Sequence, residues 1–267
     1  MLIIGELINS SRKAIRPAME AYDAKAIQEL AIEQAEAGAN YIDVNCGTFV
    51  DDEEERMAWL VQTVQEVTDL PLSIDTPDTN VLARGLSLCK NGQPFVNSIT
   101  AEKDRFAATL PLVAQYHAKV VALCMDDNGM PTTKEERVDI ATRLINGLTQ
   151  GGVPLEDIYI DPLVKPISTA DQAGRDVLNT ITVIKEAFPT VNFICGLSNI
   201  SFGLPNRKWI NRAFMVQTMT AGMNGYILNP TDQVMMAMLY ASDALLGNDP
   251  FCGRFIAAHR KGLYEDI

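Results

Sequence analysis

Eight short apolar segments recur along this chain, and nearly all of them end on a carboxylate or an amide. They follow one another at intervals of roughly 24 to 40 residues, which is typical of alternating strands and helices. The predicted strands cover residues 2–9, 41–45, 71–76, 95–100, 119–125, 158–163, 192–199 and 225–230. Eight such units predict an α/β fold, a single (β/α)8 TIM barrel, over residues 1–267.

A helix is predicted after each strand, with a further helix closing the chain beyond Asp249. Asp23 is placed to cap the first helix, and Gly38 to end it. The predicted helices cover residues 23–37, 51–67, 79–89, 101–116, 133–148, 170–187, 208–219 and 232–246. A doubly wound open sheet also alternates strands and helices. It more often has five or six strands and a glycine-rich first turn, and no GxGxxG occurs here.

The composition of the chain argues against several classes of protein. The net charge of −12 argues against binding to nucleic acid or to an anionic membrane, because both need a basic surface. No apolar run approaches the roughly 20 residues of a membrane span, and the N-terminus lacks the basic region of a signal peptide. Five scattered cysteines without a CxxC pair fit reduced thiols in a cytoplasmic protein.

The polar strand ends are expected to meet, because the carboxyl ends of barrel strands share one mouth. The candidate site residues are Glu6, Asn9, Asp43, Asn45, Asp75, Asn97, Asp161, Ser198, Asn199 and Asn229. No lysine stands among them, so the site is expected to suit a phosphate or carboxylate poorly. A carboxylate accepts two parallel hydrogen bonds from neighbouring N–H groups, and an amide both donates and accepts. A 2-amino-4-oxo-pteridine presents such an edge, with Asp75, Asn97 and Asp161 as the best partners.

Structural roles compete with this interpretation. Asp161 precedes Pro162 and fits a turn, Asp75 fits a cap of the following helix, and Asn45 and Asn97 fit partners of barrel backbone groups. Divalent metal binding by the carboxylates is a sharper rival, but amides outnumber well-spaced acids, so no metal site is predicted.

Other residue types that often carry chemistry fit structural roles here. His117 and His259 fall on helices away from the mouth, and Cys46 and Cys195 have no candidate base nearby in sequence. The methionines at 235, 236 and 238 have helical spacing, which favours a core or interface.

Motifs across nearly the whole chain resemble the methyltetrahydrofolate:corrinoid protein methyltransferases, which share the pterin-binding barrel superfamily with dihydropteroate synthase. The matching segments are Ile4-Gly5-Glu6-Leu7-Ile8-Asn9, Asp43-Val44-Asn45, Ser73-Ile74-Asp75, Val96-Asn97-Ser98, Tyr159-Ile160-Asp161-Pro162-Leu163, Gly196-Leu197-Ser198-Asn199 and Asn211-Arg212. The resemblance implies methyl transfer between a corrinoid protein and N5 of tetrahydrofolate.

The resemblance also implies residue roles. Asp75, Asn97 and Asp161 match the positions that anchor the pterin, and Asn199 matches the catalytic amide near N5. The strand-end residues Glu6, Asn9, Asp43, Asn45 and Ser198 match the surrounding pocket. Two departures are Phe202, where an acetogen-type enzyme has glutamine, and Lys165, which replaces an apolar residue.

The cobalamin is expected on a separate corrinoid protein that docks at the barrel mouth, because the Asp-x-His-x-x-Gly signature of corrinoid binding is absent. The resemblance further implies a homodimer, and a place either as the second methyltransferase of a demethylase system or in acetogenic metabolism. A dihydropteroate synthase-like enzyme is one alternative, although its anion-binding motifs are missing. A folate-binding barrel without catalysis is the other.

Overall fold

Eight parallel strands alternate with helices in the computed structural model, which describes residues 1–264. The strands are β1 (Leu2–Asn9), β2 (Tyr41–Asn45), β3 (Leu72–Asp75), β4 (Phe95–Thr100), β5 (Lys119–Leu123), β6 (Ile158–Asp161), β7 (Asn192–Phe193) and β8 (Gly225–Leu228). The helices are α1 (Arg16–Glu20), α2 (Ala24–Glu36), α3 (Glu53–Gln65), α4 (Thr79–Leu88), α5 (Lys103–Gln115), α6 (Lys134–Gln150), α7 (Ala173–Ala187), α8 (Arg207–Ala221), α9 (Gln233–Leu245) and α10 (Gly253–Arg260).

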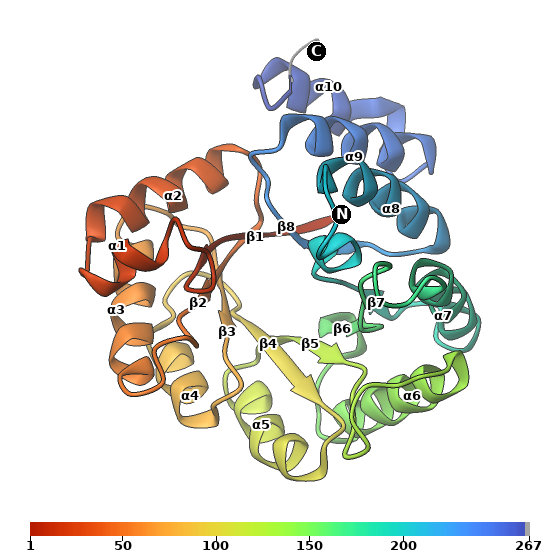
Figure 1. The fold of residues 1–267 in the computed structure, drawn as a ribbon, viewed down its shortest axis with the longest axis horizontal. Helices are drawn as coiled ribbons and strands as arrows, with labels where there is room; N and C mark the ends of the chain where they lie inside the picture. Colours follow the sequence, from red (N-terminus) through yellow and green to blue (C-terminus); the bar gives the residue numbers. More distant parts are fainter. Residues whose placement is uncertain (265–267) are drawn as a thin grey trace.

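The sheet has the strand order β7-β6-β5-β4-β3-β2-β1-β8, so neighbours in sequence are neighbours in space. The helices form a ring outside the strands, and α10 lies beyond α9 near the C-terminus (Figure 1). The predicted (β/α)8 barrel is confirmed, and the predicted strand and helix positions agree with the structure to within a few residues at most ends.

The seventh strand is the main exception to the predicted elements. It was expected to run over residues 192–199, but β7 ends at Phe193 and a 3-10 turn, η2 (Leu197–Ser201), follows. A Cβ on Gly196 would lie 3.1 Å from Asn199 Nδ2, so the tight turn into η2 favours glycine there. The backbone N–H of Ile227 donates to the carbonyl of Cys195 at 2.9 Å, and this contact closes the barrel between β7 and β8.

Two layers of side chains fill the barrel interior. The lower layer is apolar and aromatic, with ring centroids 5.3 Å apart for Tyr41 and Phe95 and 5.1 Å apart for Phe95 and Tyr159. Its buried members are Ile4, Tyr41, Phe95, Val121, Tyr159 and Ile194. Side chains two residues apart on a strand share a face, so the residues that follow these by two positions form the layer above. That upper layer contains Glu6, Asp43, Asn97, Leu123, Asp161 and Gly196.

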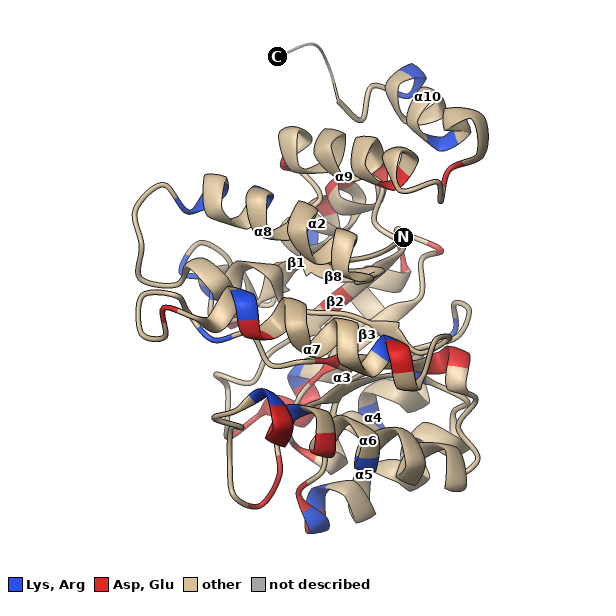
Figure 2. Cartoon of the chain, turned by 90° about the vertical axis from the view of Figure 1, so that its right-hand side faces the viewer, with Lys and Arg blue, Asp and Glu red and all other residues tan. Residues whose placement is uncertain are grey.

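The outer face of the sheet packs against the helices through a large apolar core. Met235 and Met236 are buried in it, as their spacing predicted. The short helix α1, between β1 and α2, has Pro17 at its start and buries Met19. Figure 2 shows charged residues distributed over the outer helices, with α10 standing outside the ring. Within residues 1–264, no helix has the length and apolarity that a membrane crossing requires.

Candidate functional site

A cavity of about 850 Å³ opens at the carboxyl ends of the strands, directly above the aromatic layer. Eight of the nine residues predicted to catalyse or to bind substrate line it: Glu6, Asn9, Asp43, Asp75, Asn97, Asp161, Ser198 and Asn199. The ninth, Asn45, does not line the cavity. The structure therefore brings together side chains from six parts of the chain, as expected for strand ends in a barrel.

Two amide–carboxylate pairs organise one side of the cavity. Asn97 Nδ2 donates to Asp43 Oδ1 at 3.2 Å, and Asn45 Nδ2 donates to Asp75 Oδ2 at 3.0 Å. Asp75 does not cap the next helix, because Asp78 accepts from the first N–H groups of α4 instead. The capping interpretation of Asp75 is wrong, and its carboxylate faces the cavity.

Asn45 has a positioning geometry. Its side-chain oxygen accepts from the backbone N–H of Gly47 at 3.2 Å and from Ser10 Oγ at 3.3 Å. With the oxygen occupied by these donors, the amide nitrogen is directed at Asp75. The expectation that Asn45 satisfies backbone groups holds in part, and the same contacts fix its orientation toward the site.

The carboxyl groups of the cavity have raised pKa values because they are buried. Burial raises the pKa of Asp75 to about 6 and the pKa of Asp161 to about 7. Burial also raises the pKa of Asp43, with the Asp75 carboxylate adding to the rise, and it raises the pKa of Glu6. Ionised carboxylates here lack bulk water, so a ligand that brings N–H donors would stabilise the charged forms.

Asp161 both stabilises a turn and lines the cavity. Its Oδ1 accepts from the backbone N–H of Leu163 at 2.8 Å, which is the turn contact that Pro162 suggested. Arg137, fully buried on α6, donates to the carbonyl of Pro162 at 3.1 Å and holds this turn in place. The two alternatives for Asp161 therefore coexist in one residue.

Asn199 lies on η2, at the β7 side of the cavity. Arg207, the first residue of α8, donates from Nη2 to the carbonyl of Ser198 and from Nε to Ser201 Oγ at 2.9 Å. Ser201 is fully buried and donates to Asn211 Oδ1 at 2.7 Å. Side chains of α8, Arg207 and Asn211, therefore hold the turn that carries Ser198 and Asn199.

The cavity also contains cations that the strand-end analysis missed. Arg12, Arg207 and Lys208 line it, and we call these three residues the basic rim. The expectation that the site suits a phosphate or carboxylate poorly rested on the strand-end residues alone, and these three cations were not among them. The signal was present in the sequence, because the first turn of a helix that follows a barrel strand faces the same mouth.

The two departures from the family pattern fall in different places. Phe202 lines the cavity with 65% of its surface exposed, and the Arg207 guanidinium lies 5.9 Å from its ring centroid. Lys165 does not line the cavity, since its Nζ donates to the carbonyl of Pro131 at 2.7 Å and ties down the loop after β5. Asn229 borders a side recess of about 140 Å³ that also reaches Glu6 and Lys208.

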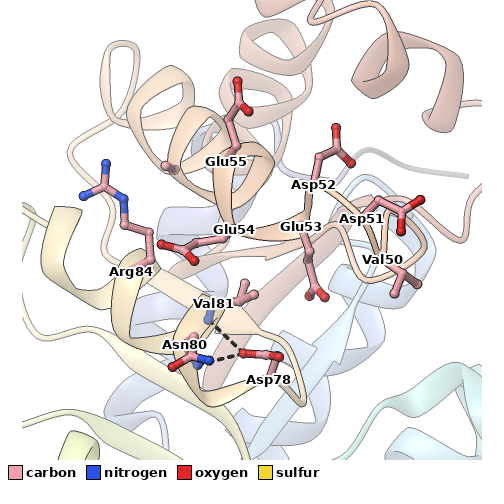
Figure 3. A pocket seen from close by; sticks show the side chains of 11 residues that line it. Val50, Asp51, Asp52, Glu53, Glu54, Glu55, Asp78, Asn80, Val81 and Arg84 are labelled. Atoms are coloured by element: carbon pink, nitrogen blue, oxygen red, sulfur yellow. Dashed lines mark hydrogen bonds between the residues drawn. The ribbon is translucent and has the colours of Figure 1, made fainter.

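A second hollow of about 610 Å³ lies beside the mouth, between the starts of α3 and α4. Figure 3 shows it crowded with acids, and Asp78 there accepts from the backbone N–H groups of Asn80 and Val81. Across residues 1–264, no group of three or more His, Cys, Asp or Glu side chains is placed to hold a metal ion. His117 and His259 do not line the large cavity.

The chain is similar to known proteins over most of its length. A family model described as pterin binding enzyme matches residues 5–229. A methylcorrinoid:tetrahydrofolate methyltransferase from Eubacterium limosum is 38% identical over 264 residues, which cover 98% of this chain and 97% of that protein. Methionine synthase from Mycobacterium tuberculosis is 36% identical over 243 residues, covering 86% of this chain and 20% of that protein.

Solved structures agree on the fold. A dihydropteroate synthase from Clostridium difficile superimposes with a TM-score of 0.70 at 19% identity, covering 92% of this chain and 96% of that one. Identity this low supports a shared fold alone. From the family match and the 38% identity over almost its full length, this chain belongs to the pterin binding enzyme family, among its corrinoid-linked methyltransferases.

Proposed function

We propose that this chain transfers a methyl group from a methylated corrinoid protein to N5 of tetrahydrofolate. The observation that carries the proposal is the arrangement of Asp75, Asn97 and Asp161, which we call the polar wall of the cavity. They lie above the apolar and aromatic layer, which we call the aromatic floor. The name of the Eubacterium limosum relative, methylcorrinoid:tetrahydrofolate methyltransferase, supports this substrate pair and this direction. The reverse direction, from methyltetrahydrofolate to a corrinoid, uses the same site.

The wall fits the pyrimidine edge of a pterin. Asp75 and Asp161 offer carboxylates to the 2-amino group and the ring N–H groups, and Asn97 offers both a donor and an acceptor. Because burial holds the pKa of Asp161 at about 7, the N–H donors of the pterin would draw it into the ionised form on binding.

Asn199 is proposed to contact N5, the nitrogen that gains or loses the methyl group. An amide side chain can donate to N5 or accept from a protonated N5, so one side chain serves both protonation states. The protein otherwise supplies orientation and exclusion of water, and the corrinoid supplies the cobalt that exchanges the methyl group.

The corrinoid is proposed to arrive on a partner protein that docks at the mouth. Neither histidine of the chain lines the cavity, which is consistent with cobalt ligation elsewhere. A role in a demethylation pathway, a cytoplasmic location, a homodimeric state and a single domain over residues 1–267 are further parts of this proposal. Residues 265–267 of that domain lie outside the described part of the chain.

A spectral assay tests the function. Purified protein is mixed with tetrahydrofolate and methylcobalamin or a methylated corrinoid protein, and formation of cob(I)alamin is followed by its absorbance. Methyl transfer dependent on both substrates is the expected result. Tight folate binding with no transfer to or from any corrinoid would instead favour a storage barrel. Condensation of a pterin pyrophosphate with p-aminobenzoate would favour the dihydropteroate synthase alternative.

A further inference from the structure

The three cations of the basic rim gather in one sector of a strongly acidic protein. Arg12 follows β1, and Arg207 and Lys208 follow β7, so all three lie in the β7-β8-β1 sector of the barrel. The anchoring candidates Asp75 and Asn97 stand on β3 and β4, across the mouth. One continuous cavity of about 850 Å³ contains both groups.

Arg207 is a cation that neutral groups hold in place, although its charge also lowers the pKa of the Glu6 carboxyl against the larger effect of burial. Its guanidinium is oriented by the Ser201 hydroxyl and the Ser198 carbonyl, which are neutral acceptors. Within residues 1–264, neither Arg207 nor Lys208 forms an ion pair, whereas Arg12 lies 3.4 Å from Glu6. A guanidinium held by neutral groups at the edge of a cavity is suited to bind an anion.

The covalent structure of a folate would place the carboxylates of its glutamate tail in this sector. In a pterin, the tail leaves from C6, the carbon bonded to N5, and the 2-amino edge lies at the opposite end of the bicycle. A pterin with its 2-amino edge at β3 and β4 and N5 at Asn199 therefore directs its tail toward η2 and α8. The tail ends in one or more glutamates, each with a carboxylate at neutral pH.

We propose that Arg12, Arg207 and Lys208 form a subsite for the glutamate carboxylates of the folate tail, so that this barrel prefers polyglutamylated folates. The exposed ring of Phe202, which lines the cavity beside Arg207, provides a surface for the aromatic ring of the tail. This inference rests on the proposed function, since it assumes a pterin in the cavity, and it assigns a role to Phe202 that the family comparison leaves open.

Binding measurements with three ligands test the subsite: 6-methyltetrahydropterin, which has no tail, tetrahydrofolate with one glutamate, and tetrahydrofolate with three. We expect affinity to rise along this series and the gain to shrink at high salt, because screening weakens exposed ion pairs. Lys208→Gln should weaken triglutamate binding about two- to fivefold, the usual value of one exposed ion pair, and leave 6-methyltetrahydropterin unchanged.

Further variants sharpen the test. Arg12→Gln combined with Lys208→Gln should remove most of the preference for three glutamates over one, whereas Lys13→Gln, a change in the same loop as Arg12 but outside the cavity, should preserve it. Phe202→Ala should weaken both folates relative to 6-methyltetrahydropterin. Equal affinity of the wild-type protein for all three ligands, or a preference that the double variant keeps, would overturn this inference alone. Failure of the wild-type protein to bind any of the three would overturn the proposed function together with it.

Discussion

Asn45 donates a hydrogen bond to the carboxylate of Asp75 across 3.0 Å, from a side chain that the cavity does not expose. The hydrogen bond lowers the pKa of Asp75 against the larger effect of burial, which raises it to about 6. Asn45 therefore favours the ionised form of Asp75, which is the form that could accept two hydrogen bonds from the pterin of the proposed function.

Replacement of Asn45 by alanine should raise the pKa of Asp75 and weaken tetrahydrofolate binding below neutral pH. A hydrogen bond to a charged group is worth about 1.5–3 kcal/mol, so a loss of about tenfold or more is expected near pH 6. The loss should diminish at pH 9, where Asp75 is ionised in both proteins. Titrations of the ligand over this pH range measure the effect. Asn45→Asp, which places a like charge beside Asp75, should give a larger loss, and an unchanged pH profile in both variants would contradict the role of Asn45.

The buried carboxyl of Asp161 is expected to lower the stability of the unliganded protein near neutral pH, whereas its ionised form is expected to strengthen pterin binding. Burial raises its pKa from 3.8 to about 7, so the folded chain holds a proton that the unfolded chain has released between these values. The contribution of this group to stability is present below pH 3.8 and is lost as the pH rises to about 7, by up to about 1.4 kcal/mol per pH unit.

The Asp161→Asn variant removes this titration while its side-chain oxygen can still accept from Leu163. We expect the unliganded variant to be more stable than the wild-type protein at pH 8, and the difference to shrink toward pH 4. Urea unfolding at several pH values measures this. The same variant should bind tetrahydrofolate more weakly, because the carboxylate is lost. If the difference in free energy of unfolding between the variant and the wild-type protein is the same at pH 8 and pH 4, the titration of Asp161 does not change the stability of the protein.

Most of the barrel follows from patterns that are local in sequence. Several strands carry an apolar residue two positions before a polar one, as in Tyr41 and Asp43, Phe95 and Asn97, or Tyr159 and Asp161. This period places the polar residue directly above the apolar one inside a barrel, so the floor and the wall of the cavity are both encoded strand by strand.

The features that were not predicted depend on contacts made by the segment after β7, either with another strand or within the turn before α8. The end of β7 at Phe193 is set by the turn at Gly196 and by the hydrogen bond from Ile227, which belongs to another strand. Arg207 was assigned to no site, because its role arises from its contacts with Ser198 and Ser201 across the turn before α8. The place of Arg207 in the first turn of α8 was visible in the sequence, but these two contacts were not.

The aromatic floor should be necessary for the stability of the barrel. Phe95 is fully buried and contacts both Tyr41 and Tyr159 edge to face. Phe95→Ala should reduce the free energy of unfolding by about 3–5 kcal/mol, the usual range for such truncations. Phe95→Leu keeps most of the volume and should cost less. Chemical denaturation of the two variants provides the comparison, and equal stability of Phe95→Ala and the wild-type protein would mean that the floor is not tightly packed.

Asn199 offers the sharpest separation of binding from chemistry. The anchors on β3, β4 and β6 should hold the pterin without it, so Asn199→Ala should retain tetrahydrofolate affinity within about tenfold. The contact with N5 matters most as the charge on that nitrogen changes, and removal of one such hydrogen bond typically costs about a hundredfold or more in rate. Single-turnover methyl transfer from a methylated corrinoid to tetrahydrofolate, with the protein in excess, measures the step directly. Asn146→Ala, the same change at an exposed position of α6 outside the cavity, serves as the matched control. Transfer at the wild-type rate by Asn199→Ala would remove this residue from the mechanism and leave orientation by the pterin anchors as the main contribution of the protein.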